Sequence, residues 1–323
     1  MIFKRINAVF NPECYHGWGI NKRFFEGWYF KIISSDQNFA YAFIPGVAMD
    51  INGKKQSFIQ VLDGKKLTSD YHKFNFNDFK PSSYSFDVKI LNNEFSDQNM
   101  ILDLPNIKGK ISFGDLFRWP SNLFSPGIMG PYSFVPFMEC YHGIISMNHN
   151  LSGSLKINNK DVNFKNGKGY IEKDWGHSFP EAYIWLQCNN FESKNISIKA
   201  SVAKIPWLNK SFIGFIAGLL INNKLIRFTT YNKSKINTCN VNNNEVELNF
   251  ENNSYKLKIN VKRKVSTKLF APIIGFMDKR VEESMDSIIH VTLHNKKNNK
   301  ELFSEKGTSA AIEVAGKYRQ LIK

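Results

Sequence analysis

The chain has 323 residues, of which 42% are hydrophobic and 14% aromatic, with 28 phenylalanines among them. This length and composition suit one large β domain or two medium ones. The chain carries 43 basic and 28 acidic residues, a formal net charge of +15. No nucleic-acid-binding motif accompanies that charge, so we predict no nucleic-acid partner. We attribute it mainly to solvated faces, with weak attraction to anionic membranes as a lesser alternative.

The cysteines and the termini point to an intracellular location. The four cysteines form no CxxC pair, so no zinc site is predicted, and their wide spacing leaves disulfides open. Residues 1–7 lack the apolar region of a signal peptide. The longest apolar run, residues 212–221, is about half the length that spans a bilayer. We therefore expect a cytoplasmic protein with reduced thiols, or one peripheral to a membrane.

In chain order, the first fifteen residues read as an arm, and residues 27–33 then alternate as a strand with Trp28, Phe30 and Ile32 on one face. Short strands follow at turn-like spacing, and Asn52-Gly53 is a hairpin-type turn. The further strands expected in this half are residues 39–44, 57–62, 84–91, 99–104, 107–113, 144–147, 153–157, 162–164 and 168–175.

Residues 118–140 differ from the rest, because prolines and glycines alternate there with aromatic side chains. This pattern predicts a long ordered loop packed by its own rings, and such loops often act as lids. Glu139 and His142, at and just beyond its end, are secondary candidates for substrate binding.

The second half repeats the strand pattern and contains one short helix candidate, residues 278–286. Neither a GxGxxG fingerprint nor a P-loop is present, which argues against a nucleotide cofactor. We predict an all-β chain of two antiparallel barrel or sandwich units, residues 1–178 and 179–323, or else a single larger barrel. The strands expected in this half are residues 183–188, 196–205, 213–221, 225–231, 246–250, 255–261 and 288–294.

Residues 168–191 hold the densest mixture of charges and rings. Extended backbone places Glu172 and Asp174 on one face and Lys173 and Trp175 on the other. Two carboxylates at this spacing can share a proton, which splits their pKa values.

A turn should follow that strand. Gly176 and Pro180 break the pattern, so His177 is expected on the turn. A second strand containing Trp185 begins beyond it, and the two strands would form a wall of a pocket.

Several of these stretches carry a family resemblance. They are Gly-Tyr-Ile-Glu-Lys-Asp-Trp-Gly-His-Ser-Phe-Pro at 169–180, His-Gly-Trp-Gly at 16–19, Phe-Phe-Glu-Gly-Trp-Tyr-Phe-Lys at 24–31, Ser-Phe-Ile-Gln-Val-Leu-Asp-Gly at 57–64 and Ser-Ala-Ala-Ile-Glu-Val-Ala-Gly at 309–316. Together they resemble the tocopherol cyclase-like family over nearly the whole chain. That family is loosely similar to the paired lipocalin-like barrels of carotenoid hydratase relatives, so lipocalin-like units are expected.

The resemblance implies closure of a prenylated hydroquinone to a chromanol, an intramolecular addition that requires no metal and no cofactor. An alkene is a poor base, so the site needs a strong acid in a dry pocket, with rings to stabilise the cation. Asp174 is the expected acid and Glu172 its partner. The other catalytic candidates are His177 and Lys173. The substrate-binding candidates are Trp175, Trp28, Tyr29, Glu26, Lys31, Trp185, Glu139 and His142.

Each of these candidate site residues also has a purely structural interpretation. The carboxylates of residues 172 and 174 can be ion-paired surface groups, the tryptophans can be core, and Glu26, Tyr29 and Lys31 can belong to a buried structural ion pair. At the level of function, the alternatives are a non-catalytic lipid or isoprenoid carrier and a hydratase or hydrolase that uses the same carboxylates. The expected ligand in each cyclase or carrier case is an apolar isoprenoid or quinol.

Overall fold

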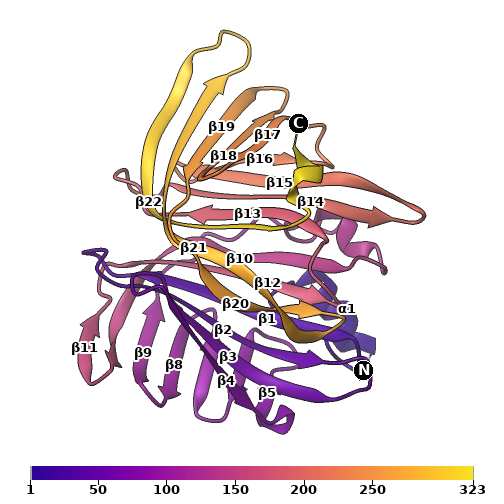
Figure 1. Ribbon diagram of the computed structural model, residues 1–323, viewed down its shortest axis with the longest axis vertical. Coiled ribbons are helices and arrows are strands. Elements are labelled where there is room, and N and C mark those ends of the chain that lie inside the picture. The colour runs from indigo at the N-terminus through magenta and orange to yellow at the C-terminus, as the bar shows by residue number, and fades with distance from the viewer. Residues whose placement is uncertain (1, 323) are drawn as a thin grey trace. The chain divides into compact units, whose positions relative to one another are not determined.

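The computed structural model describes residues 2–322, with the side chain of Lys279 left aside, and forms two antiparallel sheets (Figure 1). The prediction of an all-β chain with two antiparallel units is confirmed. Each sheet has its own apolar cluster, so the chain does not form the single larger barrel.

The first unit comprises the chain up to Phe179 together with Leu269–Arg280. Its sheet has the order β4-β3-β2-β1-β12-β10-β9-β8-β7-β6-β5, with β11 paired to β10. Its strands are β1 (Phe24–Ile33), β2 (Ala40–Met49), β3 (Lys55–Asp63), β4 (Thr68–Phe74), β5 (Phe79–Pro81), β6 (Asp87–Ile90), β7 (Asn93–Ser96), β8 (Asn99–Leu104), β9 (Ile107–Phe113), β10 (Cys140–Ile157), β11 (Lys160–Asn163) and β12 (Lys168–Gly176). It also contains the helix α1 (Ile2–Phe10) and the short 3-10 turns η1 (Phe76–Asp78) and η2 (Gly130–Phe134).

The second unit comprises Pro180–Lys268 and the chain from Val281 onward. Its sheet has the order β16-β15-β14-β13-β22-β21-β19-β18-β17, with β20 paired to β21. The elements of this half of the chain are β13 (Ala182–Cys188), β14 (Ser197–Trp207), β15 (Lys210–Ile221), β16 (Lys224–Thr229), β17 (Lys235–Asn242), β18 (Glu245–Glu251), β19 (Tyr255–Lys262), β20 (Thr267–Ile273), β21 (Phe276–Asn295), β22 (Glu301–Gly316) and η3 (Tyr318–Leu321). Most of β20 and the start of β21, Leu269–Arg280, belong to the first unit.

The tip of the β20–β21 hairpin packs on the first sheet, although its sequence lies in the second half of the chain. The Phe270 amide donates to Gln60 Oε1 at 2.8 Å, and the Met49 amide donates to the carbonyl of Gly275 at 2.9 Å. Gly275 has φ +85°, and a Cβ there would lie 2.2 Å from the Met49 oxygen, so the contact requires glycine.

Asparagine closes two of the tight hairpins. Asn158 and Asn159 join β10 to β11 with φ of 49° and 64°, and Asn222 and Asn223 join β15 to β16 with φ of 49° and 58°. Both central residues of such a turn lie in the left-handed region, which asparagine tolerates better than most residues. Part of the asparagine content therefore specifies turns.

Residues 278–286 form part of β21, so the predicted short helix is wrong. Val281 and Glu283 are buried while Arg280 and Glu282 are exposed, which is the two-residue period of a strand; the alternation ends at the buried Ser284, where the pairing with β22 shifts register. Glu283 pairs with Glu313 on β22. Because β22 is distant in the sequence, the local pattern of residues 278–286 could not indicate this strand pairing.

Residues 118–140 form a long irregular segment up to the first residue of β10, as predicted, but only some of its rings are packed. Trp119 is buried, whereas Phe124 is 80% exposed and Phe134 and Phe137 are about half exposed. The expectation that the loop is packed by its own rings is therefore wrong for Phe124, and Phe134 packs instead on the Phe10 ring of α1. All four cysteines are free thiols.

Candidate functional site

The site is built around β12, which lies between β1 and β10 (Figure 1). The antiparallel register sets Glu172 opposite Tyr29 on β1 and Asp174 opposite His142 on β10. Side chains alternate along each strand, so these four residues share one face, which we call the carboxylate face. Lys173 and its neighbours project from the opposite face, which we call the lysine face.

On the carboxylate face, His142 bridges two carboxylates. Its Nδ1 lies 2.6 Å from Asp174 Oδ1, and its Nε2 lies 3.5 Å from Glu172 Oε2. The Tyr170 hydroxyl donates a short hydrogen bond to Glu172. One ligand atom from each of the three residues lies within 4.8 Å of the others, close enough to hold a shared proton or one cation.

Burial is graded across this cluster. The side-chain exposure is 5% for Glu172, 12% for His142 and 27% for Asp174. Glu172 is thus the inner member, and Asp174 is the one with most access to a ligand. The interpretation of Glu172 and Asp174 as surface groups in bulk solvent is therefore wrong. Both carboxylates do lie within ion-pairing distance of His142.

Two further groups on the carboxylate face are held neutral. Burial, reinforced by Glu172, raises the pKa of Tyr170 well above its usual value. Burial and then the Asp174 charge raise the pKa of Cys140, whose thiol lies 3.9 Å from Asp174 Oδ1. Lys31 is buried opposite Tyr170, so the predicted residues Tyr29 and Lys31 both lie on this face.

The lysine face contains a fully buried ion pair. Lys173 Nζ lies 2.5 Å from Glu26 Oε1, and both side chains are inaccessible to solvent. Lys173 also donates to the backbone carbonyls of Pro12 and Cys14. Glu26 accepts from the amides of His16 at 2.9 Å and Gly17 at 3.2 Å. The pair therefore fastens the N-terminal arm to the sheet, in agreement with the structural interpretation of Glu26.

Two tryptophans flank this lysine. The Lys173 ammonium lies 4.7 Å from the ring centroid of Trp28 and 4.9 Å from that of Trp175, and the His16 ring stacks on Trp175 at 3.9 Å. Both tryptophans belong to the apolar core of the first unit. The predicted aromatic wall thus surrounds a cation of the protein itself and faces away from Glu172 and Asp174.

Electrostatics keep this buried network in one charge state. Burial alone would raise the pKa of Glu26, but the Lys173 ammonium and the His16 contact outweigh it and hold the pKa below its usual value. Burial, together with the Lys173 charge, lowers the pKa of His16 to about 4. Glu26 is therefore ionised and His16 neutral at pH 7.

The remaining predicted residues lie outside both clusters. His177 is exposed on the bend after β12, where its amide donates to the carbonyl of Glu139 at 2.9 Å. Glu139 is partly buried just before β10. Trp185 belongs to β13 of the second unit, where it pairs with Ser201 and Glu313.

Sequence reasoning missed Tyr170 and Cys140. Each lies two residues before a predicted site residue, Glu172 and His142 respectively, so strand alternation alone was a sufficient signal. It also missed Lys199, a fully buried lysine on β14 whose ammonium donates to Ser201 at 2.6 Å. Its signal was a lysine between the apolar residues Ile198 and Ala200 at the start of the strand.

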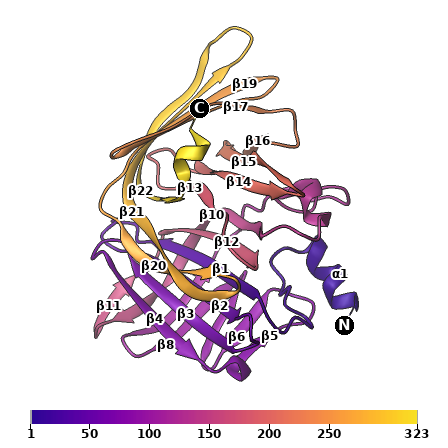
Figure 2. The same ribbon diagram turned by 45° about the vertical axis from the view of Figure 1, so that its right-hand side comes forward.

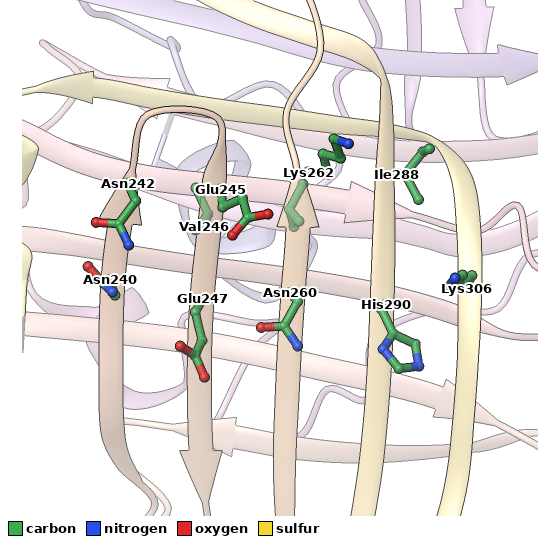
Figure 3. Close-up of a pocket in the computed structure, with 11 residues that line it drawn as sticks. Asn240, Asn242, Glu245, Val246, Glu247, Asn260, Lys262, Ile288, His290 and Lys306 are labelled. Atoms are coloured by element: carbon green, nitrogen blue, oxygen red, sulfur yellow. The ribbon is translucent and has the colours of Figure 1, made fainter.

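A separate polar depression of about 450 Å³ lies on the second unit (Figure 3). Asn240, Glu247, Asn260, His290 and Lys306 form a row across β17, β18, β19, β21 and β22, each paired with the next. Its lining mixes amides, charges of both signs and a few aliphatic side chains, and contains no phenylalanine, tyrosine or tryptophan. We interpret this row as a solvated face of the sheet, and it shares no residue with the carboxylate face.

Comparison with known proteins then decides the family. The profile of the tocopherol cyclase-like family matches residues 105–316, more than half of the chain. The chain belongs to this family. The matched region includes the parts of the carboxylate face on β10 and β12, whereas β1 lies outside it.

The relatives are distant. The chain is 24% identical over 144 residues to the chloroplastic tocopherol cyclase of Zea mays, covering 45% of this chain and 27% of that protein. It is 23% identical over 252 residues to a chloroplastic protein of Oryza sativa subsp. japonica described as a probable tocopherol cyclase, covering 62% and 54% respectively. The chain thus spans about half or less of the length of these curated relatives.

A solved structure supports the fold. The crystal structure of CghA with Sch210972 superposes with a TM-score of 0.56 at 11% identity, covering 91% of this chain and 88% of that chain. At this identity the likeness concerns the fold alone, and it agrees with the predicted pair of lipocalin-like units.

Proposed function

We propose that this tocopherol cyclase-like chain is a cofactor-independent acid catalyst that adds a phenol hydroxyl to an isoprenoid alkene of the same molecule. The observation that supports this most directly is the His142 ring between Asp174 and Glu172, on a largely buried face. Such a trio can store one proton, release it to an apolar ligand and recover it afterwards.

Asp174 is the proposed proton donor, as the sequence suggested. It is the most accessible of the three groups, and its Oδ1 is held by His142, which leaves the second oxygen to face a ligand. His142, with Glu172 behind it, then serves as the group that returns the proton. The neutral Tyr170 hydroxyl holds Glu172 in place.

The proposed reaction balances without any redox change. The Asp174 carboxyl gives its proton to one alkene carbon, which forms a C–H bond and leaves a tertiary cation at the other carbon. The phenol oxygen captures that cation in a new C–O bond. The phenol proton passes to the His142 and Glu172 pair and from there back to Asp174. The product is an isomer of the substrate.

The cation needs nearby π faces, and each such contact stabilises it by roughly 0.5–2 kcal/mol. Trp28 and Trp175 already surround Lys173 on the other face. We therefore assign this role to the ring of Tyr29, which lies on the carboxylate face opposite Glu172 and keeps a small exposed area, whereas Tyr170 is fully buried behind it.

The test is incubation with a panel of prenylated hydroquinones, with chromanol scored by mass and chromatography. Asp174→Asn should lower kcat about 10²–10⁴-fold, the usual contribution of a general acid. The matched control is Asp161→Asn, an exposed aspartate of the same unit, and it should retain full turnover. Turnover should also survive a strong chelator, because a proton and not a bound metal ion is proposed between the carboxylates.

Wild-type turnover by Asp174→Asn and Glu172→Gln would exclude the proposal. If no quinol turns over, but isoprenoid binding persists in both variants, the carrier interpretation replaces it. Loss of turnover on chelation, restored by a divalent cation, would assign the cluster to a metal ion instead.

A further inference from the structure

Two segments of the first unit expose an unusual amount of apolar surface. From α1, Ile2, Phe3 and Ile6 are between 52% and 78% exposed. From the segment after β9, the exposed apolar residues are Leu123 (66%), Phe124 (80%), Phe134 (48%) and Phe137 (50%). We call these seven residues the N-terminal apolar surface. Exposed groups of large apolar side chains commonly mark an interaction site.

The two segments lie against each other. The rings of Phe10 and Phe134 meet edge to face with centroids 6.0 Å apart. Pro12 contacts Gly127 so closely that a Cβ at Gly127 would lie 3.1 Å from the proline ring. Figure 2 shows α1 at the outside of the first unit. The helix and the loop are therefore neighbours, and their exposed apolar side chains lie on adjoining segments of the first unit.

The charged side chains beside this surface on α1 are basic. Residues 2–12 and 116–138 contain no aspartate or glutamate. On α1, Arg5 is exposed and donates to the carbonyl of Trp18 at 2.8 Å, and the Lys4 ammonium lies 4.0 Å from the Trp18 ring centroid. Two cations thus border the apolar side chains, on a chain whose formal net charge is +15.

We propose that the N-terminal apolar surface docks the protein on an anionic lipid membrane. Phenylalanine and isoleucine on one side of a short helix, bordered by lysine and arginine, fit the boundary between acyl chains and anionic headgroups. The aromatic residues of the neighbouring loop extend the same contact. No helix within residues 2–322 is long and apolar enough to cross a bilayer.

The surface is connected to the carboxylate face through the backbone. Phe137 precedes His142 by five positions in the chain. Tyr141, which lies on the lysine face opposite Trp175, holds the loop to β10 because its hydroxyl donates to the carbonyl of Val135. Docking therefore places the entrance to β10 near the lipid from which an isoprenoid ligand would come. Membrane docking goes beyond the proposed reaction and does not depend on it.

The experiment is flotation of the full chain with phosphatidylcholine vesicles, with and without phosphatidylglycerol. The chain should float with the anionic vesicles and not with the neutral ones. The double variant Phe3→Ser/Phe124→Ser should lower partitioning about tenfold or more, because two rings leave the membrane boundary. The matched control is Tyr84→Ser/Leu208→Ser, which removes two equally exposed side chains elsewhere, and it should partition like the wild type.

Three results would overturn the proposal. The first is no flotation with either vesicle. The second is equal flotation of wild type and Phe3→Ser/Phe124→Ser, which would reduce the effect to the general attraction of a basic chain. The third is a change of oligomeric state in sedimentation caused by Phe3→Ser/Phe124→Ser without a change in flotation, which would assign the surface to another protein chain. Circular dichroism of each variant verifies that it is folded.

Discussion

The two faces of β12 carry similar residue types in opposite arrangements. On the lysine face, Lys173 and Glu26 are inaccessible and every polar atom of the pair meets a fixed backbone or side-chain partner. On the carboxylate face, Asp174 keeps about a quarter of its side chain exposed, and one histidine serves two carboxylates. A satisfied ion pair resists change, whereas an under-partnered carboxylate can exchange a proton.

This difference separates stability from reactivity on neighbouring residues. The lysine face ties the arm at residues 12–17 to the sheet and belongs to the core. The carboxylate face is buried at Tyr170 and Glu172 but partly open at Asp174. Substitutions on the lysine face should therefore change mainly the free energy of unfolding, and those on the carboxylate face should change turnover, with a cost in stability at the buried Tyr170.

The largest effect is expected from Lys173→Met, which leaves the Glu26 carboxylate buried without its cation. Breaking a buried pair from one side typically costs about 3–5 kcal/mol of the free energy of unfolding. Urea denaturation monitored by tryptophan fluorescence measures it. Lys160→Met, at an exposed lysine of the same unit, is the control. A loss below about 1 kcal/mol would show that the pair does not fasten the arm.

Acid should weaken the lysine face next. His16 has an ordinary pKa of 6.5 and a pKa of about 4 in the folded chain. The unfolded chain therefore binds more protons between these values, so stability falls as pH drops from 7 to 4, by about 3 kcal/mol from this residue. His149, whose pKa burial lowers to about 3, adds to the same slope.

The variant His16→Asn should flatten part of this pH dependence and leave the His149 part. Denaturation midpoints between pH 7 and 4.5 measure the slope, and His294→Asn, at a partly exposed histidine, should leave it unchanged. An unaltered slope in His16→Asn would mean that His16 is already protonated in the folded chain.

A smaller effect is expected from Tyr170→Phe on the carboxylate face. It removes a hydrogen bond to a buried carboxylate, which is worth roughly 1.5–3 kcal/mol. Turnover should fall together with stability if Glu172 must be held in place for the proposed reaction. Tyr255→Phe, at a partly exposed tyrosine, is the control. Unchanged turnover would remove Tyr170 and its partner from the mechanism.

The smallest effect is expected from Cys140→Ala. The thiol is protonated and its contact with Asp174 is long, at 3.9 Å. We expect less than about 1 kcal/mol of destabilisation and unchanged turnover. Thiol-reactive probes and the turnover assay test this, and a strong loss of turnover would assign Cys140 a chemical role that its geometry does not indicate.

Much of this site was predictable from local pattern alone. A two-residue period separates Glu172 and Asp174 from Lys173 and Trp175 in any extended segment, and β12 has that separation. The same rule places Tyr29 and Lys31 on the opposite side of β1 from Trp28. The local pattern misled at residues 278–286, where charged residues on the long strand β21 imitate the spacing of a helix.

The sequence by itself determined the all-β class, the alternation along the predicted strands, and the family, because these depend on residues close together in the chain or on long motifs. It did not predict β4, β17, β20 or β22. Only the tertiary structure decided the partners. Glu26 meets Lys173, and His142 meets Asp174, because the sheet order places β12 between β1 and β10. Pairing between strands that are distant in sequence depends on the whole sheet, so no local pattern could reveal which face of β12 would bury a lysine and which would hold a proton.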